Sequence, residues 1–336
     1  MKLGEFDFIR LIRERARQAH KADTASLSTL LHSIGDDAAV IRQSGARDLV
    51  VTTDLLVEDV DFRRAWMPPE LLGHKALAVS LSDIAAMGAR PRYALLSLGV
   101  PPEIWRTDFV DRFYEGFFAL AEQHSVALIG GDVSRTPDRL MIDSIMLGEV
   151  LRGRAVLRSG ARAGDHLFVT GSLGGAAAGL KLLEQGERLT RRKARSRGER
   201  AVEHLLLRHL RPEPRVSWGA LLGEERLVTA MIDVSDGLSS DLAHLCAESS
   251  VGARLVAERI PFDPSLPDEP LSFALHGGED FELLFTVNPR HLKRLPTVLD
   301  GVHITYIGDV TQAADGITLR RGDSLSLLRP AGFSHF

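Results

Sequence analysis

The chain has 336 residues, of which 44% are hydrophobic and 26% charged, and its formal net charge is −4 at pH 7. This composition is typical of a globular protein with ample core, and the length favours two domains over one. The weak negative charge excludes a basic field for nucleic acid. The single cysteine, Cys246, excludes an internal disulfide and a cysteine-based zinc cluster, which fits a reducing cytoplasm. The charged first residues do not fit a signal peptide, and no apolar run reaches the roughly 18 residues of a membrane span. We therefore expect a soluble, cytoplasmic protein.

Helix and strand patterns alternate through the first half of the chain. The elements predicted there are a helix at 5–18, strands at 38–41 and 48–53 joined by a turn at 44–45, a helix at 71–87, a strand at 92–100, a helix at 109–124, and strands at 126–129 and 140–149. This alternation indicates α/β layers, which we assign to an N-terminal domain over residues 1–150.

A turn-rich segment at 160–165 opens the second half, where we predict a C-terminal α/β domain over residues 151–336. The elements predicted there are a strand at 166–170, an alanine-rich helix ending at 183, a strand at 227–234, a helix at 238–249, and strands at 283–287 and 304–307. Residues 186–200 carry seven basic side chains and few apolar ones. We interpret this stretch as a solvated, mobile loop rather than an anion site.

Short acidic runs recur along the chain, mostly beside glycine or at the end of an apolar run. They are GDD at 35–37, TTD at 52–54, SD at 82–83, GGD at 130–132, DVSD at 233–236, SD at 240–241 and GGED at 277–280. Mg²⁺ prefers oxygen ligands, keeps several waters, and usually bridges carboxylates to substrate phosphates. The recurrence therefore predicts a site for several Mg²⁺ ions and a polyphosphate.

Each run taken alone also has a structural interpretation. Asp and Glu beside glycine form turns and helix N-caps, so Asp236 before Gly237 fits the cap of the next helix. Asp83 is different, because it lies in a predicted helix whose neighbours are nearly all apolar, and a carboxylate buried there is costly unless it is paired or bound to metal. Asp83 is therefore the metal ligand that physical reasoning alone supports best.

Common nucleotide-binding motifs are missing from the sequence. It contains neither GxxxxGK[ST] nor the protein-kinase motifs, which excludes a P-loop site and that kinase fold. The loop GSLGG at 171–175 follows a predicted strand and opens a helix, so its amides could face an anion. A tight turn with close helix packing explains the same glycines.

The order and spacing of the motifs resemble one family over essentially the whole chain. The segments are IGDDAA at 34–39, TDLLVE at 53–58, KALAVSLSDIAAMGA at 75–89, IGGD at 129–132, RSGA at 158–161, IDVSDGL at 232–238, GGEDFEL at 277–283 and the ending GFSHF at 332–336. Together they resemble the thiamine-monophosphate kinase family, and some are shared with the wider superfamily of aminoimidazole ribonucleotide synthetase. The resemblance implies a two-domain α/β fold whose N-terminal strands pair across a homodimer. It also implies a reaction in which ATP phosphorylates thiamine monophosphate to thiamine diphosphate.

The resemblance also implies roles for individual residues. The implied Mg²⁺ ligands, some acting through water, are Asp37, Thr52, Thr53, Asp54, Asp83, Asp132, Asp233 and Asp236. The implied ATP contacts are Gly131, Asp132, Arg158, Ser235 and Tyr114. The implied substrate contacts are Asp61, Glu279 and the ring of Phe333. Asp61 departs from the family, since this chain reads VEDVDF at 57–62 where many members have VEGVHF. A carboxylate there suits a cationic thiazolium or an aminopyrimidine, but it would repel a phosphate.

The implied chemistry needs no general base, because a phosphate monoester acceptor is already anionic. The obstacle is bringing two anions together, which catalysis overcomes by positioning and by charge neutralisation. Carboxylates loaded with Mg²⁺ would clamp both reactants, and Arg158 would add a planar fork for phosphate oxygens. We expect direct in-line transfer without a phosphoenzyme. Lys75 lies one or two helical turns before Asp83 and could help to neutralise phosphate charge, but we predict a solvated side chain for it.

Two other classes of function stay open at this stage. Selenophosphate synthetase needs a cysteine or selenocysteine near the N-terminus, and the hydrogenase-maturation relative needs a C-terminal cysteine, whereas Cys246 lies among apolar residues of a predicted helix. Aminoimidazole ribonucleotide synthetase lacks support from the C-terminal motifs. The other class is a non-enzymatic protein that binds nucleotide or Mg²⁺. The presence of every expected carboxylate argues against it.

Overall fold

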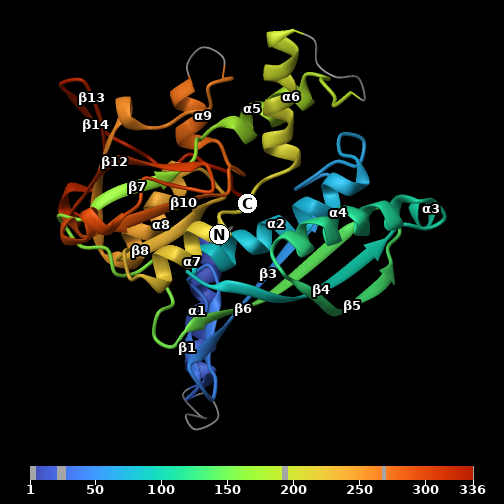
Figure 1. The fold of residues 1–336 in the computed structure, drawn as a ribbon, viewed down its shortest axis with the longest axis horizontal. Coiled ribbons are helices and arrows are strands. Elements are labelled where there is room, and N and C mark those ends of the chain that lie inside the picture. Colours follow the sequence, from blue (N-terminus) through green and yellow to red (C-terminus); the bar gives the residue numbers. More distant parts are fainter. Residues whose placement is uncertain (1–4, 21–27, 191–195, 267–269, 336) are drawn as a thin grey trace.

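Two β-sheets form the framework of the computed structural model, which describes residues 5–20, 28–190, 196–266 and 270–335 (Figure 1). The first sheet has the spatial order β1 (Leu30–His32), β2 (Ala39–Arg42), β3 (Arg47–Val57), β6 (Met141–Leu151), β4 (Arg90–Val100) and β5 (Ala127–Arg135). Its neighbouring strands run antiparallel except β4 and β5, which are parallel. β5 therefore forms one edge of this sheet.

The second sheet comes from the C-terminal half. Its spatial order is β14 (Ser324–Leu327), β13 (Ile317–Arg321), β9 (Val251–Val256), β12 (Val302–Gln312), β7 (His166–Thr170), β10 (Glu282–Val287) and β8 (Ala230–Val234), with β11 (Val298–Leu299) paired to β12. β13 and β9 are parallel and the other pairs are antiparallel.

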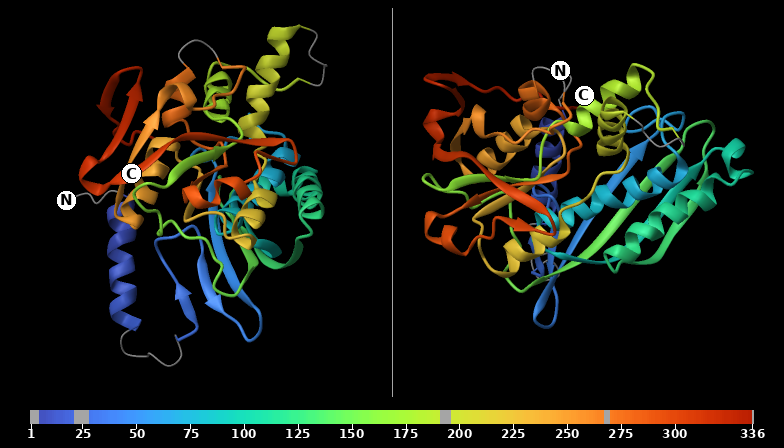
Figure 2. Two further views of the ribbon diagram at one scale, coloured as in Figure 1. Left: turned by 60° about the vertical axis from the view of Figure 1, so that its left-hand side comes forward. Right: turned by 45° about the horizontal axis from the view of Figure 1, so that its top comes forward.

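Helices cover both sheets. They are α1 (Glu5–His20), α2 (Pro69–Ala86), α3 (Pro102–Trp105), α4 (Phe109–Gln123), α5 (Gly175–Glu184), α6 (Arg197–Leu210), α7 (Val216–Glu224), α8 (Leu238–Ser249) and α9 (Pro270–His276). Figure 2 shows α1 beside β1 to β3, and an ion pair of 2.6 Å between Arg13 and Glu248 ties it to α8. Among the described residues, no helix is both long and apolar enough to cross a membrane.

Helix α2 lies at the centre of the molecule. Nearly all its side chains are buried, from Leu72 to Ala86, and a mostly apolar helix without a separate polar face belongs inside a protein. α2 and α4 lie together over one face of the first sheet (Figure 1), and α2 also contacts β8 and β10 of the second sheet. Leu283 and Phe285 of β10 join the same core, whereas Leu284 faces the core under α8. The helix therefore joins the two halves and carries Lys75 and Asp83 to their boundary.

Two glycines allow α2 and α4 to approach closely. A Cβ added at Gly73 would lie 1.8 Å from the carbonyl oxygen of Phe113, and one added at Gly116 would lie 1.8 Å from that of Glu70. We expect Gly73→Ala to lower the free energy of unfolding by about 1–3 kcal/mol or more, since backbone must move to admit the methyl group. The control is Gly198→Ala in α6, where the nearest atom is 3.9 Å away and alanine should instead stabilise by up to about 1 kcal/mol. Denaturant unfolding measures both, and equal effects would contradict this account of the helix contact.

The layered α/β fold predicted from the sequence is confirmed, and several elements match closely. The predicted strand at 166–170 and helix at 238–249 have the observed bounds of β7 and α8. The strand predicted at 126–129 was too short, because pairing with β4 continues through the glycines to Arg135. The strand predicted at 48–53 likewise extends to Val57 through its pairing with β6. The carboxylates of Asp54 and Asp132 therefore lie within strands rather than at their ends.

The basic stretch at 186–200 is not simply a solvated loop. α6 begins inside it, where Ser196 and Glu199 form a capping box that satisfies the first amides of the helix. Earlier in the stretch, the Arg188 guanidinium lies 5.5 Å from the ring centroid of Trp66. The loop prediction was wrong for residues 197–200, which belong to α6, whereas residues 187–190 lie outside helices and strands, and residues 191–195 lie outside the described residues.

Candidate active site

Three carboxylates from different elements meet at the boundary between the two halves. Asp37 precedes β2, Asp83 lies in the last turns of α2, and Asp233 lies in β8. One oxygen from each of them lies within 4.8 Å of the other two. The hydrogen bond between Ser82 Oγ and Asp233 Oδ2, 2.6 Å long, links α2 to the second sheet at this point. The structure therefore brings together residues that the sequence separates by nearly 200 positions.

The cluster fits a hard divalent cation. Burial, followed by the charges of Asp54, Asp233 and Asp37, raises the pKa of Asp83 well above its usual range. Burial and the neighbouring Asp37 charge raise the pKa of Asp233 to about 7. The Oδ2 atom of Asp37 is buried and has no hydrogen-bond partner among the described residues. Mg²⁺ would coordinate these buried oxygens, which repel one another and lack hydrogen-bond donors, and would compensate their charge.

Hydroxyl groups and a fourth carboxylate surround the cluster. Thr52 Oγ1 donates to Asp83 Oδ2 at 2.5 Å, and Ser80 Oγ donates to Asp54 Oδ2 at 2.6 Å. Burial, and then the charge of Asp143, raise the pKa of Asp54 to about 6. Thr52 and Asp54 therefore face α2, on the same side of β3 as the carboxylate cluster.

These pKa shifts predict how pH and Mg²⁺ affect stability. Between the ordinary pKa near 3.8 and the raised values, the metal-free native cluster binds more protons than the unfolded chain. The stability that the native cluster gains from this extra proton binding is therefore lost as the pH rises towards 7. Mg²⁺ requires the deprotonated ligands, so we expect it to raise the melting temperature more at pH 8 than at pH 5.5. Thermal unfolding with Mg²⁺ or with EDTA at both pH values measures this, and an equal rise at both would contradict it.

Arg158 lies against the cluster. Its Nη2 donates to Asp37 Oδ1 at 2.7 Å, and its backbone N donates to Asp36 Oδ1 at 2.8 Å. The charges of Asp37, Asp233 and Asp36 raise the pKa of the Arg158 guanidinium, although burial opposes them. Asp36 was not among the predicted site residues. Burial raises its pKa to about 7, and its position beside Asp37 was the only signal in the sequence.

Two predicted metal ligands lie on the other face of the first sheet. Thr53 Oγ1 donates to Asp143 Oδ1 at 2.7 Å, and the register pairs Asp143 with Ser97 and Ser97 with Asp132. Side chains alternate along a strand, so these residues point away from α2. Asp132 is exposed. The described chain therefore does not bring Thr53 and Asp132 to the three-carboxylate cluster.

Other predicted ATP contacts are spread over the molecule. Gly131 lies in β5, opposite Leu96 of β4. The Tyr114 ring on α4 stacks on Phe118, with 5.7 Å between the ring centroids. Ser235 follows β8 directly, next to Asp233, and its carbonyl accepts a hydrogen bond of 2.7 Å from Glu279 N.

Asp236 lies in the turn between β8 and α8. Gly237 takes the N-cap position of α8, and the Gly237 amide donates to the Asp241 carboxylate at 3.0 Å. The alternative that Asp236 caps this helix is therefore wrong. The carbonyl of Asp236 instead accepts from Phe333 N at 3.0 Å, which holds the C-terminal segment over the start of α8.

The predicted substrate residues lie in one neighbourhood. Glu279 Oε1 lies 2.7 Å from Lys75 Nζ, and the Glu279 charge contributes to raising the pKa of Asp61, an effect that burial dominates. His335 Nε2 lies 4.0 Å from Asp61 Oδ1, and its ring meets the Phe333 ring edge-on at 4.8 Å. The other Asp61 oxygen, Oδ2, accepts from Val57 N at 2.7 Å. Asp61, Glu279 and the C-terminal residues thus form a chain of contacts.

The glycine loop at 171–175 holds a protein carboxylate. The amides of Gly174 and Ala176 donate to Asp280 at 2.5 and 3.1 Å, and Arg208 Nη2 lies 3.3 Å from the same side chain. The start of α5 is therefore occupied by Asp280, which favours the tight-turn interpretation over contact with a phosphate.

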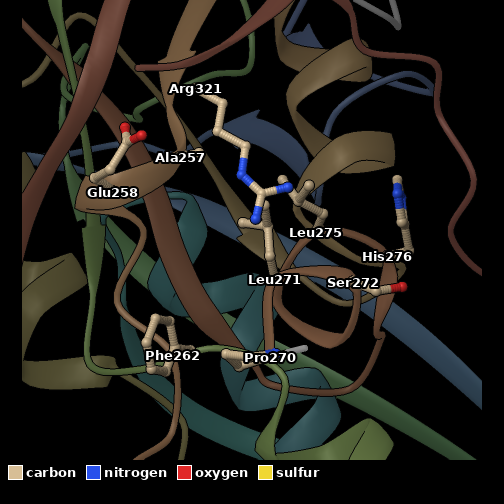
Figure 3. A pocket seen from close by; sticks show the side chains of 9 residues that line it. All are labelled: Ala257, Glu258, Phe262, Pro270, Leu271, Ser272, Leu275, His276 and Arg321. Carbon is tan, nitrogen blue, oxygen red and sulfur yellow. The ribbon is translucent and has the colours of Figure 1, made fainter. Parts of the chain in front are cut away.

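A cavity of about 530 Å³ lies elsewhere in the C-terminal half (Figure 3). Its walls come from Ala257, Glu258, Phe262, Pro270, Leu271, Ser272, Leu275, His276 and Arg321. None of these is a predicted site residue. The Nδ1 atom of His276, in the wall of the cavity, lies 2.9 Å from Ser239 Oγ at the start of α8.

Comparison with known proteins identifies the family. The chain matches the model described as AIR synthase related protein, N-terminal domain, over residues 35–150, and its C-terminal counterpart over residues 162–319. It is 37% identical over 340 residues to the thiamine-monophosphate kinase of Bacillus subtilis (strain 168), covering 99% of this chain and 100% of that protein. It is also 37% identical over 345 residues to the thiamine-monophosphate kinase of Escherichia coli (strain K12), covering 100% and 99%.

Solved structures agree with this assignment. The structure described as "AaThiL complexed with AMPPCP and TMP" has a TM-score of 0.81 and 32% identity, covering 100% of this chain and 99% of that chain. The crystal structure of thiamine-monophosphate kinase from Stenotrophomonas maltophilia K279a has a TM-score of 0.74 and 38% identity, covering 97% and 99%. The chain belongs to the thiamine-monophosphate kinase family, within the AIR synthase related proteins.

Proposed function

We propose that this chain is an ATP-dependent thiamine-monophosphate kinase, which transfers the γ-phosphoryl group of ATP to thiamine monophosphate and releases thiamine diphosphate and ADP. The main support within the molecule is the cluster of Asp37, Asp83 and Asp233, with Arg158 beside it. Relatives that match over the full length carry this name, and a related structure holds AMPPCP and TMP, which we take as an ATP analogue and the acceptor.

The carboxylate cluster is the proposed Mg²⁺ site. Asp37, Asp83 and Asp233 would hold the ions, with Thr52 and Asp54 beside them and Asp236 at the next turn of chain. Bound there, Mg²⁺ would neutralise the charge of the polyphosphate and of the acceptor. The chain itself fixes the ligand positions through the hydroxyls of Thr52, Ser80 and Ser82.

Arg158 would contact ATP. Its guanidinium is held by Asp37 at the edge of the cluster, with its planar fork available to phosphate oxygens. Ser235 and Gly131 are proposed contacts to the same nucleotide, and Tyr114 is a further one. The acceptor phosphate is already anionic, so no residue of the chain needs to act as a general base. We expect direct in-line transfer, without a phosphorylated side chain.

The thiamine moiety would lie between the loop holding Glu279 and the C-terminal segment. Glu279 would face the cationic part of the acceptor, with Asp61 near it and the Phe333 ring available for stacking. Phe333 is 50% exposed, so its ring has room for a partner.

A second copy of the chain is proposed to cover the open face of the first sheet. Large apolar side chains are exposed on this face, namely Leu55, Tyr93 and Met141, at 42–61% exposure, and Ile129 and Val133 are exposed on the edge strand β5. Such a patch is typical of a protein interface. Thr53 and Asp132 lie on the same face, so a homodimer would bury them and place them to complete a shared site. In this proposal residues 1–150 form the dimer and residues 151–336 close the active site.

Release of ADP tests the proposed activity. We expect ADP to form when thiamine monophosphate is added to the chain with ATP and Mg²⁺, and not when thiamine replaces it or EDTA removes the metal. Nucleotide binding without ADP release on any of these additions would favour a non-enzymatic binding protein. We keep the cytoplasm as the expected compartment, because ATP is the co-substrate.

A further inference from the structure

Lys75 is buried in the centre of the molecule. It lies in α2 with 0% of its side chain exposed, so the prediction of a solvated lysine was wrong. Its Nζ lies 2.7 Å from Glu279 Oε1. A charged amine without contact to water is costly unless a counter-charge compensates it. Glu279 supplies that charge from a loop far away in the sequence.

The other oxygen of Glu279 is held by a second group. His209 of α6 is 5% exposed, and its Nδ1 lies 2.8 Å from Glu279 Oε2. Each carboxylate oxygen therefore meets one nitrogen, from α2 on one side and α6 on the other. The Glu279 backbone is also fixed, since its N donates to Ser235 O at 2.7 Å and its φ is 66°, in the left-handed region that non-glycine residues rarely adopt.

Glu279, Lys75 and His209 differ in how far solvent and ligands can reach their side chains. Glu279 keeps 28% of its side chain exposed, whereas Lys75 has none exposed and His209 almost none. A ligand can therefore touch Glu279 but cannot reach Lys75 in this arrangement. Glu279 is therefore the nearest group through which Lys75 can act on a ligand, and the Lys75 charge also reaches Asp61, whose pKa it lowers against the larger effect of burial.

The electrostatic environment keeps Glu279 ionised. Burial alone would raise the pKa of this carboxyl, but the nearby Lys75 ammonium, and after it His209, lower it to about 2. Burial, and then the charge of Lys75, lower the pKa of His209 itself. The other charged groups facing this set are Asp61, after β3, and Glu184, in α5, with His335 of the C-terminal segment near Asp61.

We propose that Lys75 and His209 are positioning residues, which hold Glu279 as an oriented carboxylate that binds the cationic thiamine part of the acceptor. This inference rests on the proposed kinase activity. It makes Lys75 a determinant of acceptor affinity and not a catalytic residue, since it lies behind the side chain that meets the acceptor.

The test is the kinetics of Lys75→Met alone and combined with Glu279→Gln. We expect Lys75→Met to raise KM for thiamine monophosphate by about 10–100-fold, with KM for ATP changed by less than about threefold. In the Glu279→Gln background, Lys75→Met should raise this KM little further, because the effects of two residues that act through one contact are not additive. Lys293→Met is the control, because that lysine is exposed.

The pH dependence gives a readout that a purely structural role would not produce. Without Lys75 the pKa of Glu279 rises, so the variant should lose acceptor affinity as the pH falls from 8 to 5.5, whereas the wild type should keep Glu279 ionised throughout. The ratio of KM values, variant to wild type, cancels the ionisation of the acceptor phosphate and should increase towards low pH.

Several outcomes would overturn the inference. If Lys75→Met raises KM for the acceptor equally with and without Glu279→Gln, Lys75 acts independently of the carboxylate. A fall in kcat with no change in KM for the acceptor would lead to the same conclusion. If Lys75→Met does not fold, His209→Gln and its combination with Glu279→Gln decide by the same criterion. A wild type that makes no thiamine diphosphate would overturn the proposed activity itself, whereas wild-type turnover with additive variants overturns only this inference.

Discussion

Replacing Asp83 with asparagine is expected to lower kcat by on the order of a thousandfold while the chain stays folded. Asp83 lies between Asp37, Asp233 and the hydroxyl of Thr52, at the point where the two halves of the chain meet. Asparagine keeps the shape of the side chain but removes the charge that would bind the metal. Loss of a like charge also relieves repulsion, so the melting temperature without metal should be unchanged or higher.

Steady-state kinetics and thermal unfolding measure the two effects of Asp83→Asn. Asp111→Asn is the matched control, since Asp111 is exposed on α4. A kcat within about threefold of the wild type would contradict the assignment of Asp83 as a metal ligand. A lower melting temperature with the same loss of kcat would instead show that its role is structural.

Replacing Arg158 with lysine is expected to lower kcat/KM for ATP by on the order of a hundredfold. The guanidinium reaches Asp37 while its backbone amide is held by Asp36, so its position is fixed at the edge of the carboxylate cluster. Lysine keeps the positive charge but cannot present two parallel donors to a phosphate. The loss therefore reports the geometry of the fork rather than the charge.

The control for Arg158→Lys is Arg106→Lys, at an exposed position after α3. KM for thiamine monophosphate should change little in Arg158→Lys, because the proposed contacts of the acceptor lie beside Glu279. An unchanged kcat/KM for ATP, or an effect confined to the acceptor, would contradict the assignment of Arg158 to the nucleotide.

The fold could be predicted from the sequence wherever local pattern and tertiary packing agree. β7 and α8 have the predicted bounds because a short apolar run between turns and an amphipathic run after Gly237 each have one interpretation. β5 was predicted too short, since Gly130 and Gly131 are weak strand residues and only the neighbouring β4 keeps them extended. α6 was missed because most of its early residues are charged.

For the candidate site, too, some features could be predicted from the sequence and others could not. Asp83 was singled out because a lone carboxylate in an apolar helix needs an explanation, and the structure places it beside Asp37 and Asp233. The burial of Lys75 could not be predicted in this way, because its partner Glu279 lies on a distant loop and a lysine in a helix is usually solvated. Their roles in metal and substrate binding stay predictions.

The positions of Thr53 and Asp132 show what one chain cannot explain. Both belong to the predicted metal ligands, yet the strand register places them on the open face of the first sheet, beside exposed apolar residues. Nothing in the sequence distinguishes that face from the one under α2, because each strand has apolar residues on both sides. The proposed second copy would supply the missing neighbours.

Identification of the product by ³¹P NMR tests the central claim most directly. The chain would be mixed with ATP, Mg²⁺ and thiamine monophosphate, with parallel samples that contain thiamine or EDTA. The account predicts that the monoester signal of the acceptor is replaced by the two signals of a diphosphate as ATP is converted to ADP, only with the monophosphate and the metal. An unchanged acceptor signal while ATP is bound or hydrolysed would contradict it.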